Sequence, residues 1–382
     1  MAGRDRAGNV SEVQDPAAGP GNTEPVDDPY RPGGSAASPA VSTRTIVLGI
    51  LLVVVLAVGL VLLLGKLAGY QEVLAALQRA NPQWLLACLV LEVTALTGYV
   101  MSIRGVIAYD GGPLLRPVSS VRLWLATVGG TRIVSPAGAG GMAVMFWLLR
   151  RAGLGSRASA ARVLGFNILV FAVFGGWAFV TAVLIALSLG QSAPLGITLP
   201  WIIGVPIIGI AAFWVSQGRR GVRLSTDTGR GWLRKALAGA VTGLMFARSV
   251  LGPPHPDGRA FGGAIVYWAA DVACLWAALQ AVGADVSLHG VGLAYATAYV
   301  AMLLPLPTGG YGAIDAAATF ALTVLGVPLA EAVVGVVVWR VFNFWLPTLP
   351  GLVELARSQG LGRRLAKENG APEGPVPGAG AR

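Results

Sequence analysis

The chain has 382 residues and a formal net charge of +10 at pH 7. Hydrophobic residues make up 55% of it and charged residues only 12%, whereas about a quarter of the residues in a soluble domain are charged. This composition, with a mean hydropathy of +0.68, excludes a water-soluble globular domain and indicates a membrane protein. The arginines flank apolar runs and do not alternate with aromatic residues on one face, so the positive charge does not indicate a nucleic-acid partner.

The two ends of the chain differ in composition from the middle. Residues 1–43 are rich in Pro, Gly, Ala and Ser without apolar periodicity, so we expect a disordered cytoplasmic tail. The apolar run at 45–65 is uncharged and long enough to cross a bilayer core of about 30 Å. It begins too far into the chain for a cleaved signal peptide, and we interpret it as a retained span. Residues 359–382 predict a second disordered, basic cytoplasmic tail, which leaves 44–358 as an integral membrane domain.

Within that domain, basic loops set the expected orientation. Further apolar runs occupy residues 84–103, 121–134, 140–149, 158–189, 200–215, 261–282, 290–304, 313–325 and 329–349. The basic loop at 219–235 and the basic C-terminal segment should face the cytoplasm, and the uncharged loop at 190–200 should face outward. Residues 231–250 predict a cytoplasmic interfacial helix. The sequence thus predicts an all-α polytopic protein of the cytoplasmic membrane with about seven spanning helices and both termini cytoplasmic.

Two pairs of short apolar runs, at 121–150 and 290–326, must each return to the side from which they start. Each pair therefore predicts a helical hairpin, with a tip too rich in Pro and Gly to continue as helix. Arms of about fifteen residues favour re-entrant hairpins whose tips lie inside the membrane against a cavity. The alternative is that both arms span and the tips are surface turns. The tip residues whose backbone we expect at the cavity are Pro136, Gly138, Gly141, Pro307, Gly309, Gly310 and Gly312.

The two hairpins align with each other. Setting Pro136 on Pro307 also places four further identical pairs without a gap, Gly138 on Gly309, Gly141 on Gly312, Leu154 on Leu325 and Gly155 on Gly326. The flanking charges require the two units to enter from opposite faces. Such a pair predicts an inverted-topology repeat, the architecture in which transporters place broken helices at the midplane.

Among the ionisable residues that fall within apolar segments, five are candidate site residues, because a charge inside the membrane normally faces the bundle interior or water. They are Glu92, Arg132, Asp271, Asp315 and Arg340. Arg340 lies near mid-depth in the last span and needs an anionic partner, which we expect to be Asp271 first and Asp315 second. Asp315 begins the helix after the second tip, where the helix N-terminus stabilises a carboxylate.

Two interpretations of these charges stay open. An Arg–Asp pair can simply lock helices together, or Arg340 can offer its planar fork to a lipid phosphate. Arg132 can do the same from the first hairpin, or extend to the interface. Glu92 can pair with either arginine, or serve as a contact between helices. Asn167 and Asn343 are predicted to be interhelical hydrogen-bond partners.

No catalytic pattern is found in the sequence. It has no Ser/His/Asp arrangement in a suitable context, no clustered His or Cys ligands and no phosphate-binding GxxxxGK[ST]. We therefore expect no enzymatic activity, no metal and no cofactor. Cys88 and Cys274 both fall within predicted spans, so we expect lipid-facing or core thiols rather than a disulfide framework.

The segment PLPTGGYGAIDAAATFALTVLGV, followed by WRVFNFWLPTLPGLVEL, resembles a known family. It is similar to the C-terminal half of the flippase-like membrane domain of lysylphosphatidylglycerol synthases and their stand-alone relatives. The positions that match the family pattern are Pro307, Gly309, Gly310, Gly312, Asp315, Arg340, Trp345, Pro347 and Gly351. The family also tends to be acidic at the position of Asp271. The segment after Leu349 is too short for the soluble aminoacyl-transfer domain, so lysyl transfer is not expected.

The resemblance and the buried charges together favour a lipid translocase that moves an anionic or polar-headgroup lipid. One alternative is a membrane-embedded subunit that presents lipid to a lipid-modifying enzyme or assembles with it. Another is a secondary transporter of a small solute. For a lipid translocase, the expected partner is a membrane lipid that bears a phosphate or another anionic group.

Overall fold

The computed structural model describes residues 71, 75, 78–133, 139–187, 193–225, 231–252, 258–303 and 311–370. These residues are helical throughout, with connecting turns and no strand among them. The predicted first tail and the predicted span at 45–65 lie outside them. So do the hairpin-tip residues Pro136, Gly138, Pro307, Gly309 and Gly310.

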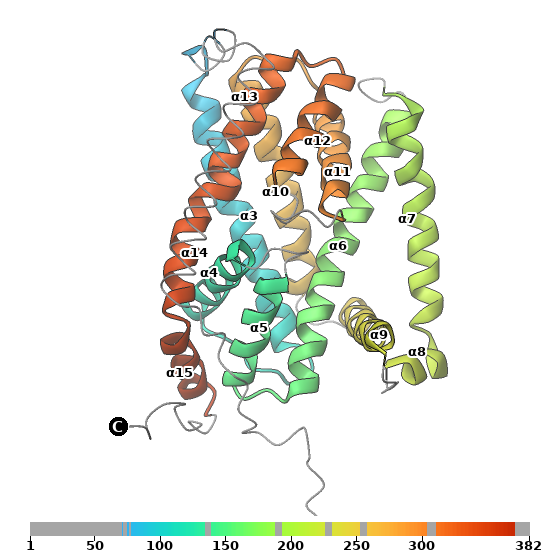
Figure 1. The fold of residues 1–382 in the computed structure, drawn as a ribbon, viewed down its shortest axis with the longest axis vertical. Coiled ribbons are helices and arrows are strands. Elements are labelled where there is room, and N and C mark those ends of the chain that lie inside the picture. The colour runs from blue at the N-terminus through green and yellow to red at the C-terminus, as the bar shows by residue number, and fades with distance from the viewer. Residues whose placement is uncertain are drawn as a thin grey trace, which may run out of the picture.

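Five of the described helical segments are long and apolar enough to cross a membrane, judged by length and composition. They are α3 (Pro82–Ala108), α6 (Ser156–Ala186), α7 (Leu195–Val215), α10 (Arg259–Ala281) and the continuous stretch Leu329–Ala356. Each overlaps a span predicted from the sequence, and all run along the long axis of the molecule (Figure 1). The chain is therefore an all-helical, multi-pass membrane protein. The predicted total of about seven spans stays a prediction.

The tightest pair of helices is α3 and α10, which meet through small residues. A Cβ on Gly98 would lie 2.7 Å from the backbone nitrogen of Tyr267, and one on Gly105 would lie 2.5 Å from that of Ala260. Small residues of this kind let membrane helices approach until their backbones touch. Cys88 and Cys274 face each other across this contact as free, fully buried thiols. They are core thiols, one of the two expected environments.

An arginine that the sequence did not single out holds α6 against α3. Arg162 is buried and donates from Nη2 to the carbonyl of Tyr109 at 2.6 Å and from Nε to that of Ile107 at 3.1 Å. These carbonyls end α3 and have no partner within the helix. A cation at a helix C-terminus also interacts favourably with the helix dipole. Arg162 therefore has a structural role at the end of the molecule that carries α9.

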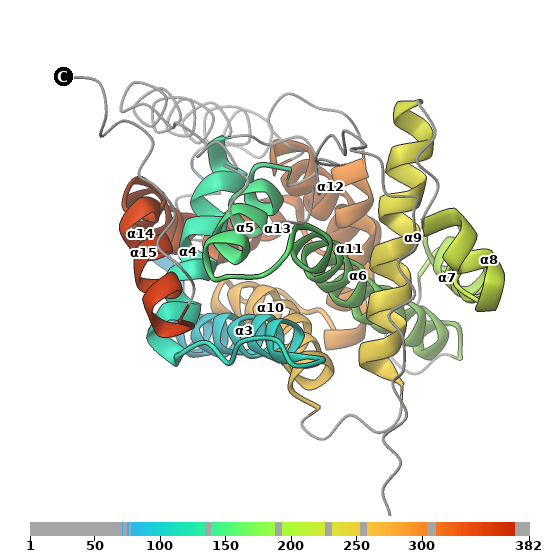
Figure 2. The same ribbon diagram turned by 90° about the horizontal axis from the view of Figure 1, so that it is seen from below.

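Helix α9 (Trp232–Leu251) lies across the long axis, seen end-on in Figure 1 and lengthwise in Figure 2. It matches the helix predicted at 231–250, and it follows the short α8 (Gly218–Ser225). Tyr109 at the end of α3 donates its hydroxyl to the carbonyl of Ser249 at 2.9 Å, which ties α9 to the bundle. A helix perpendicular to the spans is the arrangement that an interfacial helix adopts, although its place at an interface stays a prediction.

The two predicted hairpins occupy opposite halves of the molecule. Helices α4 (Pro117–Ile133) and α5 (Ala139–Arg151) lie in the lower half of Figure 1. Helices α11 (Leu288–Val300) and α12 (Tyr311–Val324), with the short η2 (Ala301–Leu303) after α11, lie in the upper half. At a rise of 1.5 Å per residue these arms are about 20–26 Å long, shorter than a bilayer core of about 30 Å.

The turn that follows each hairpin has the same geometry, but not in the register that the sequence alignment gave. Gly153 (φ 97°) precedes α6 and Gly326 (φ 91°) precedes α13 (Leu329–Arg340), each with a left-handed backbone. In both turns the next residue donates its N–H to a carbonyl five positions back. Gly155, which the alignment set on Gly326, instead has φ −63° as the N-cap of α6. The alignment was two residues out here because identical residues do not show which of two neighbouring glycines has the left-handed backbone.

The C-terminal helices pack on the first hairpin. Helix α14 (Leu346–Ala356) crosses α4 so closely that a Cβ on Gly129 would lie 2.3 Å from the carbonyl oxygen of Gly351. Arg122 on α4 forms a 2.9 Å ion pair with Glu354 on α14. These contacts place the end of the last span beside the hairpin that the sequence predicts to enter from the cytoplasm.

The predicted disorder of residues 359–382 is wrong for the first part of that segment. Residues Ser358–Glu368 form helix α15, whose Leu361 and Leu365 are fully buried. Their spacing of four residues places both on one helix face, whereas Arg363, Arg364 and Lys367 are exposed. The basic composition of this segment obscured its apolar stripe. Residues 371–382 lie outside the described part of the chain.

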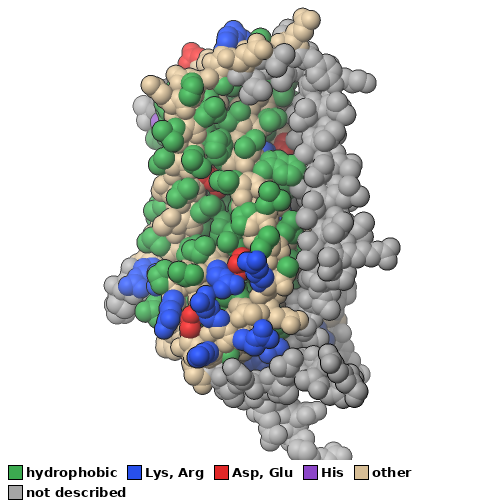
Figure 3. Space-filling model, turned by 90° about the vertical axis from the view of Figure 1, so that its left-hand side faces the viewer, with side chains coloured by type: hydrophobic (Ala, Val, Ile, Leu, Met, Phe, Trp, Pro, Cys, Tyr) green, Lys and Arg blue, Asp and Glu red, His purple; other side chains and the backbone are tan. Residues whose placement is uncertain are grey.

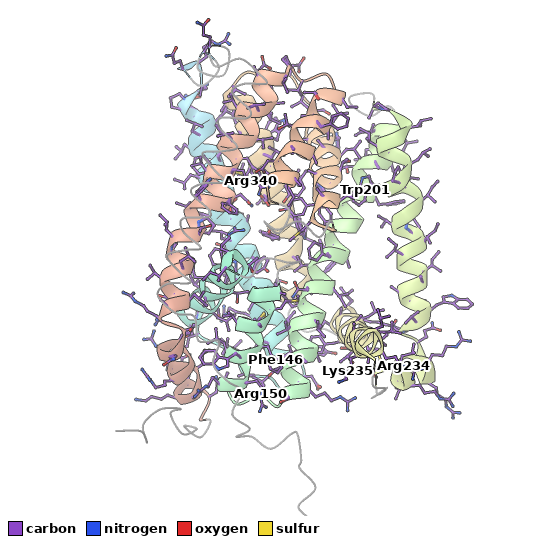
Figure 4. The ribbon with its side chains drawn as sticks, in the orientation of Figure 1. Phe146, Arg150, Trp201, Arg234, Lys235 and Arg340 are labelled. Carbon is purple, nitrogen blue, oxygen red and sulfur yellow. The ribbon has the colours of Figure 1, made fainter. Side chains whose placement is uncertain are left out.

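Basic side chains gather at one end of the molecule. In Figure 3 lysine and arginine form a band around the lower end, below a surface that is mainly hydrophobic. In Figure 4 Arg150, Arg234 and Lys235 lie at this lower end, while Arg340 lies in the upper half, inside the bundle. Arg340 is therefore distant from the basic end, where the arginines lie on which the predicted membrane orientation rests.

Candidate functional site: a cavity between the two hairpins

A cavity of about 180 Å³ lies where the two hairpins face each other. The first hairpin contributes residues of α4 and α5, the second contributes residues of α11, η2 and α12, and spans α3, α6, α10 and α13 to α14 complete the wall. The polar and charged lining consists of Glu92, Thr127, Thr131, Arg132, Asn167, Arg340 and Asn343. The aromatic lining consists of Tyr99, Trp124, Phe166, Phe171, Tyr267, Trp268 and Tyr299.

The last span is interrupted beside this cavity by a π-helical turn, η3 (Val341–Trp345). The N–H of Leu346 donates to the carbonyl of Val341, five residues back. Pro347 explains the position of the turn, because its ring clashes with the carbonyl of Asn343 in a regular α-helix and it has no N–H to donate. Single π turns are frequent at functional sites. The residues on and beside this turn supply most of the polar contacts of the site.

Arg340 forms an ion pair with Asp315 through Nε and Oδ1. Both side chains are 6% exposed, and the guanidinium carbon lies 4.3 Å above the centre of the Trp339 ring. The pair joins the last span to α12 of the second hairpin. A buried pair of this kind loses several kcal/mol of hydration per ion, which its mutual attraction and its other contacts must offset.

The expectation that Asp271 is the first partner of Arg340 is wrong. Asp271 is fully buried and accepts hydrogen bonds from Tyr295 Oη at 2.5 Å, Trp339 Nε1 at 2.8 Å and Asn343 Nδ2 at 2.9 Å. Three neutral donors already occupy its two oxygens, so Arg340 turns to Asp315 instead. Asp271 thereby ties α10 to α11 and to the π turn. Asn343 is confirmed as an interhelical partner, whereas Asn167 donates to Val163 within its own helix and lines the cavity.

Arg132 reaches the π turn from the other hairpin. It is half-buried in the last turn of α4 and donates from Nε to Thr348 Oγ1 at 3.1 Å. Its guanidinium carbon lies 3.8 Å from the centre of the Phe344 ring, in the geometry of a cation–π contact. Arg132 thus lines the cavity instead of extending to an interface. Arg132 of the first hairpin and Asp315 of the second hairpin thus contact the same stretch of the last span, at Thr348 and at Arg340.

Glu92 lies on α3 in the cavity wall and is 1% exposed. Among the described residues it forms no ion pair with either arginine, which was one of the two alternatives for this residue. Its Oε2 is buried and has no hydrogen-bond partner within that part of the chain. A carboxylate that lines a polar cavity without a counter-charge is the exception in a site whose other acids are held by several donors or by an arginine.

The structure therefore gathers all five predicted ionisable residues around one cavity and the π turn beside it. Their role in binding a substrate stays a prediction. Of the two tip glycines within the described residues, Gly141 lines the cavity, but Gly312 is exposed in the first turn of α12. In the family-matching ending, Pro347 lines the cavity and Gly351 packs against α4.

The sequence analysis missed the residues that hold these charges in place. Tyr295, Trp339, Phe344 and Thr348 contact Asp271 or Arg132, and the aromatic wall was not anticipated. Trp339 precedes Arg340 and Phe344 follows Asn343. This adjacency to predicted residues is the only feature of the sequence that could have indicated their role. Aromatic residues in an apolar span are too common to indicate a site by themselves. Among the described residues no group of acidic, His or Cys side chains is placed to hold a metal ion.

The structure thus shows a multi-pass helical membrane protein with a cavity of charged and aromatic lining between two short hairpins. Residues 46–351 match the family described as the lysylphosphatidylglycerol synthase TM region. The chain belongs to this family, as the resemblance of its second half indicated, and the family associates it with membrane lipid. No curated protein matches the chain.

Proposed function

We propose that the protein is a lipid translocase. A phosphate-bearing headgroup enters the cavity between the hairpins while its acyl chains stay in the bilayer. The observation that carries this proposal is the cavity itself, in which Arg132 and Arg340 of opposite structural units line one polar space inside an apolar bundle. Charges are placed at such depth in membrane proteins mainly along the paths of ions and substrates.

The chemistry of the two arginines supports a phosphate. Guanidinium is planar, permanently charged and suited to two parallel hydrogen bonds with an oxyanion. In the structure the carboxylate of Asp315 is the oxyanion that pairs with Arg340. A lipid phosphate would compete with Asp315 for Arg340, and release of the lipid would restore the pair. Asp315 then occupies the position on Arg340 that the phosphate of the substrate would take.

The size of the cavity supports entry of a headgroup alone. Its volume of about 180 Å³ is below the roughly 300–1,000 Å³ of sites that enclose drug-sized ligands. A whole phospholipid does not fit. A translocase needs only to shield the headgroup, because the acyl chains gain nothing by leaving the bilayer.

The arrangement of the hairpins supports movement between two faces. Arms shorter than a bilayer, in opposite halves of the molecule, favour re-entrant hairpins in an inverted repeat. When Gly153 is matched to Gly326, Asn167 of α6 falls at the position of Arg340 of α13, and both line the cavity. One unit would then open toward the basic, cytoplasmic end and the other toward the outside. The proposal assigns no catalytic role to any residue of the two hairpins or of the spans beside them.

A reconstitution experiment tests this proposal. Purified protein is placed in phosphatidylcholine vesicles with a trace of fluorescent phosphatidylglycerol, and movement of the label between leaflets is followed with an impermeant quencher. Arg340→Lys keeps the positive charge but loses the planar guanidinium group that can form two parallel hydrogen bonds. Because one hydrogen bond to a charged group contributes about 1.5–3 kcal/mol, we expect this variant to move the lipid about 10- to 100-fold more slowly. Asp315→Asn should bind the lipid at least as tightly and release it more slowly.

Arg122→Lys is the matched control. Arg122 also bonds a carboxylate through Nε, at 2.9 Å, but it does not line the cavity. This variant should move lipid at the wild-type rate. No movement by the wild-type protein, or equal slowing in both lysine variants, would contradict the proposal. Uptake of a water-soluble solute by the same vesicles would favour the transporter of small solutes, and copurification of a lipid-modifying enzyme would favour the lipid-presenting subunit.

A further inference from the structure

Glu92 is the one charged residue of the cavity wall that the proposed function does not use. It is 1% exposed, and its Oε2 has no hydrogen-bond partner among the described residues. The titratable groups around it come from several elements. Helix α10 contributes Asp271 and Tyr267, α3 itself contributes Cys88 and Tyr99, and the cavity brings in Arg132 from α4 and Arg340 from α13.

Charge balance gives Glu92 a distinctive place in this group. Arg132 and Arg340 contribute two positive charges, and Asp271 and Asp315 contribute two negative charges, each carboxylate held by its own donors. The site is therefore neutral without Glu92. An ionised Glu92 adds an excess negative charge beside another carboxylate. A buried carboxylate without a partner is costly enough that it takes up a proton instead.

We propose that Glu92 is a proton-binding site whose protonation is coupled to the binding of the lipid phosphate in the same cavity. A phosphate diester brings one negative charge. Beside it, ionised Glu92 would create repulsion that protonated Glu92 does not. By thermodynamic reciprocity, a proton on Glu92 strengthens phosphate binding as much as phosphate strengthens proton binding.

The proton step balances simply. The carboxylate of Glu92 takes a proton from water on the side where the headgroup enters and forms a neutral carboxylic acid. The O–H bond breaks again when the headgroup leaves, and the proton passes to water on that side. Lipid and proton thus move together, and a proton gradient supplies a driving force. The inference rests on the proposed function and adds an energy source to it.

The test measures binding, which does not depend on the rate of movement. Purified protein in neutral detergent is titrated with short-chain phosphatidylglycerol over a range of pH, by calorimetry in buffers of different ionisation enthalpy. Wild-type affinity should fall as pH rises, by at most about tenfold per pH unit for a single proton. Binding should take up protons in the range where the affinity changes. The phosphate diester itself does not titrate there, so the slope reports a protein group.

Three variants assign that slope. Glu92→Gln should bind with the affinity that wild type reaches at acidic pH, without pH dependence and without proton uptake. Glu92→Asp should keep the dependence with a shifted midpoint. Glu354→Gln is the control, because Glu354 is a largely buried acid that pairs with Arg122 away from the cavity wall. It should keep the wild-type slope.

The outcomes separate this inference from the function on which it rests. Wild-type binding that is independent of pH, or a slope that survives in Glu92→Gln, overturns the role of Glu92 and leaves the translocase intact. Absence of phosphatidylglycerol binding at every pH overturns both. If Glu92→Gln does not fold, the infrared C=O band of a protonated carboxylic acid carries the test: it should grow when phosphatidylglycerol is added to the wild type in the pH range where the affinity changes, and it should shift in frequency in Glu92→Asp. A band that does not change on binding would overturn the inference.

Discussion

The Arg340–Asp315 pair should behave as a buried unit in which each partner is costly alone. Asp315→Leu leaves the guanidinium buried without its carboxylate, and Arg340→Met leaves the carboxylate without its guanidinium. Removing one member of a buried ion pair typically costs about 3–5 kcal/mol, whereas replacing both with apolar residues is often neutral or stabilising. Both side chains are only 6% exposed, so little solvent screening relieves the single variants. Since Arg340 also lines a cavity that water can enter, we expect the lower end of the range, about 3 kcal/mol for each.

Reversible unfolding of the detergent-solubilised protein in mixed micelles measures these values. The double variant should recover to within about 1 kcal/mol of wild type, which gives a large favourable coupling in the double-mutant cycle. It should nevertheless fail to bind phosphatidylglycerol, because the arginine fork is gone. Additive losses in the double variant would show that Arg340 and Asp315 do not depend on each other, and the competition between Asp315 and phosphate would be wrong. Recovery of both stability and lipid movement would refute the role of Arg340 in binding.

Three further predictions follow from the packing and orientation. Gly129→Leu should lower the melting temperature sharply because its Cβ meets the backbone of α14 at 2.3 Å, whereas Gly176→Leu, with nothing within 4 Å, should be tolerated. Tyr295→Phe removes one of three donors to the buried carboxylate of α10 and should cost about 1–3 kcal/mol in the same unfolding assay. Reporter fusions should read cytoplasmic after Gln217 and external after Gln191, and the same reading at both would contradict the assigned orientation.

Sequence reasoning reached the fold class because its signals are local. A long apolar run with few charges is visible in any window, and five such runs overlap helices long and apolar enough to cross a membrane. Composition alone was misleading at α15, where arginines and glycines obscured two leucines four residues apart. The alignment of the hairpins also had the wrong register at the turn that follows them. The correct register is shown by the left-handed backbone of Gly153 and Gly326, and the identical residues nearby did not reveal this correspondence.

The candidate site was predictable in its members but not in its pairing. An ionisable residue inside a span is rare enough to stand out, so Arg340, Asp315 and Asp271 could be named from the sequence. Which carboxylate meets the arginine depends on how many donors each already has. Asp271 accepts hydrogen bonds from Tyr295 on α11, Trp339 on α13 and Asn343 on η3, and no pattern in the sequence shows that these three neutral groups converge.

The interrupted backbone and the buried charges have one physical explanation. A continuous α-helix satisfies its own N–H and C=O groups and presents only side chains to a cavity. The π turn before Pro347 instead widens the last span directly after Arg340, where Arg132 approaches it from the first hairpin and Asp315 from the second. If the protein is a lipid translocase as proposed, an arriving phosphate would exchange the carboxylate contact of Arg340 for another oxyanion. Asp315 would then balance the buried guanidinium of Arg340 whenever no phosphate is bound, so that the site could open toward a lipid without first creating an uncompensated charge.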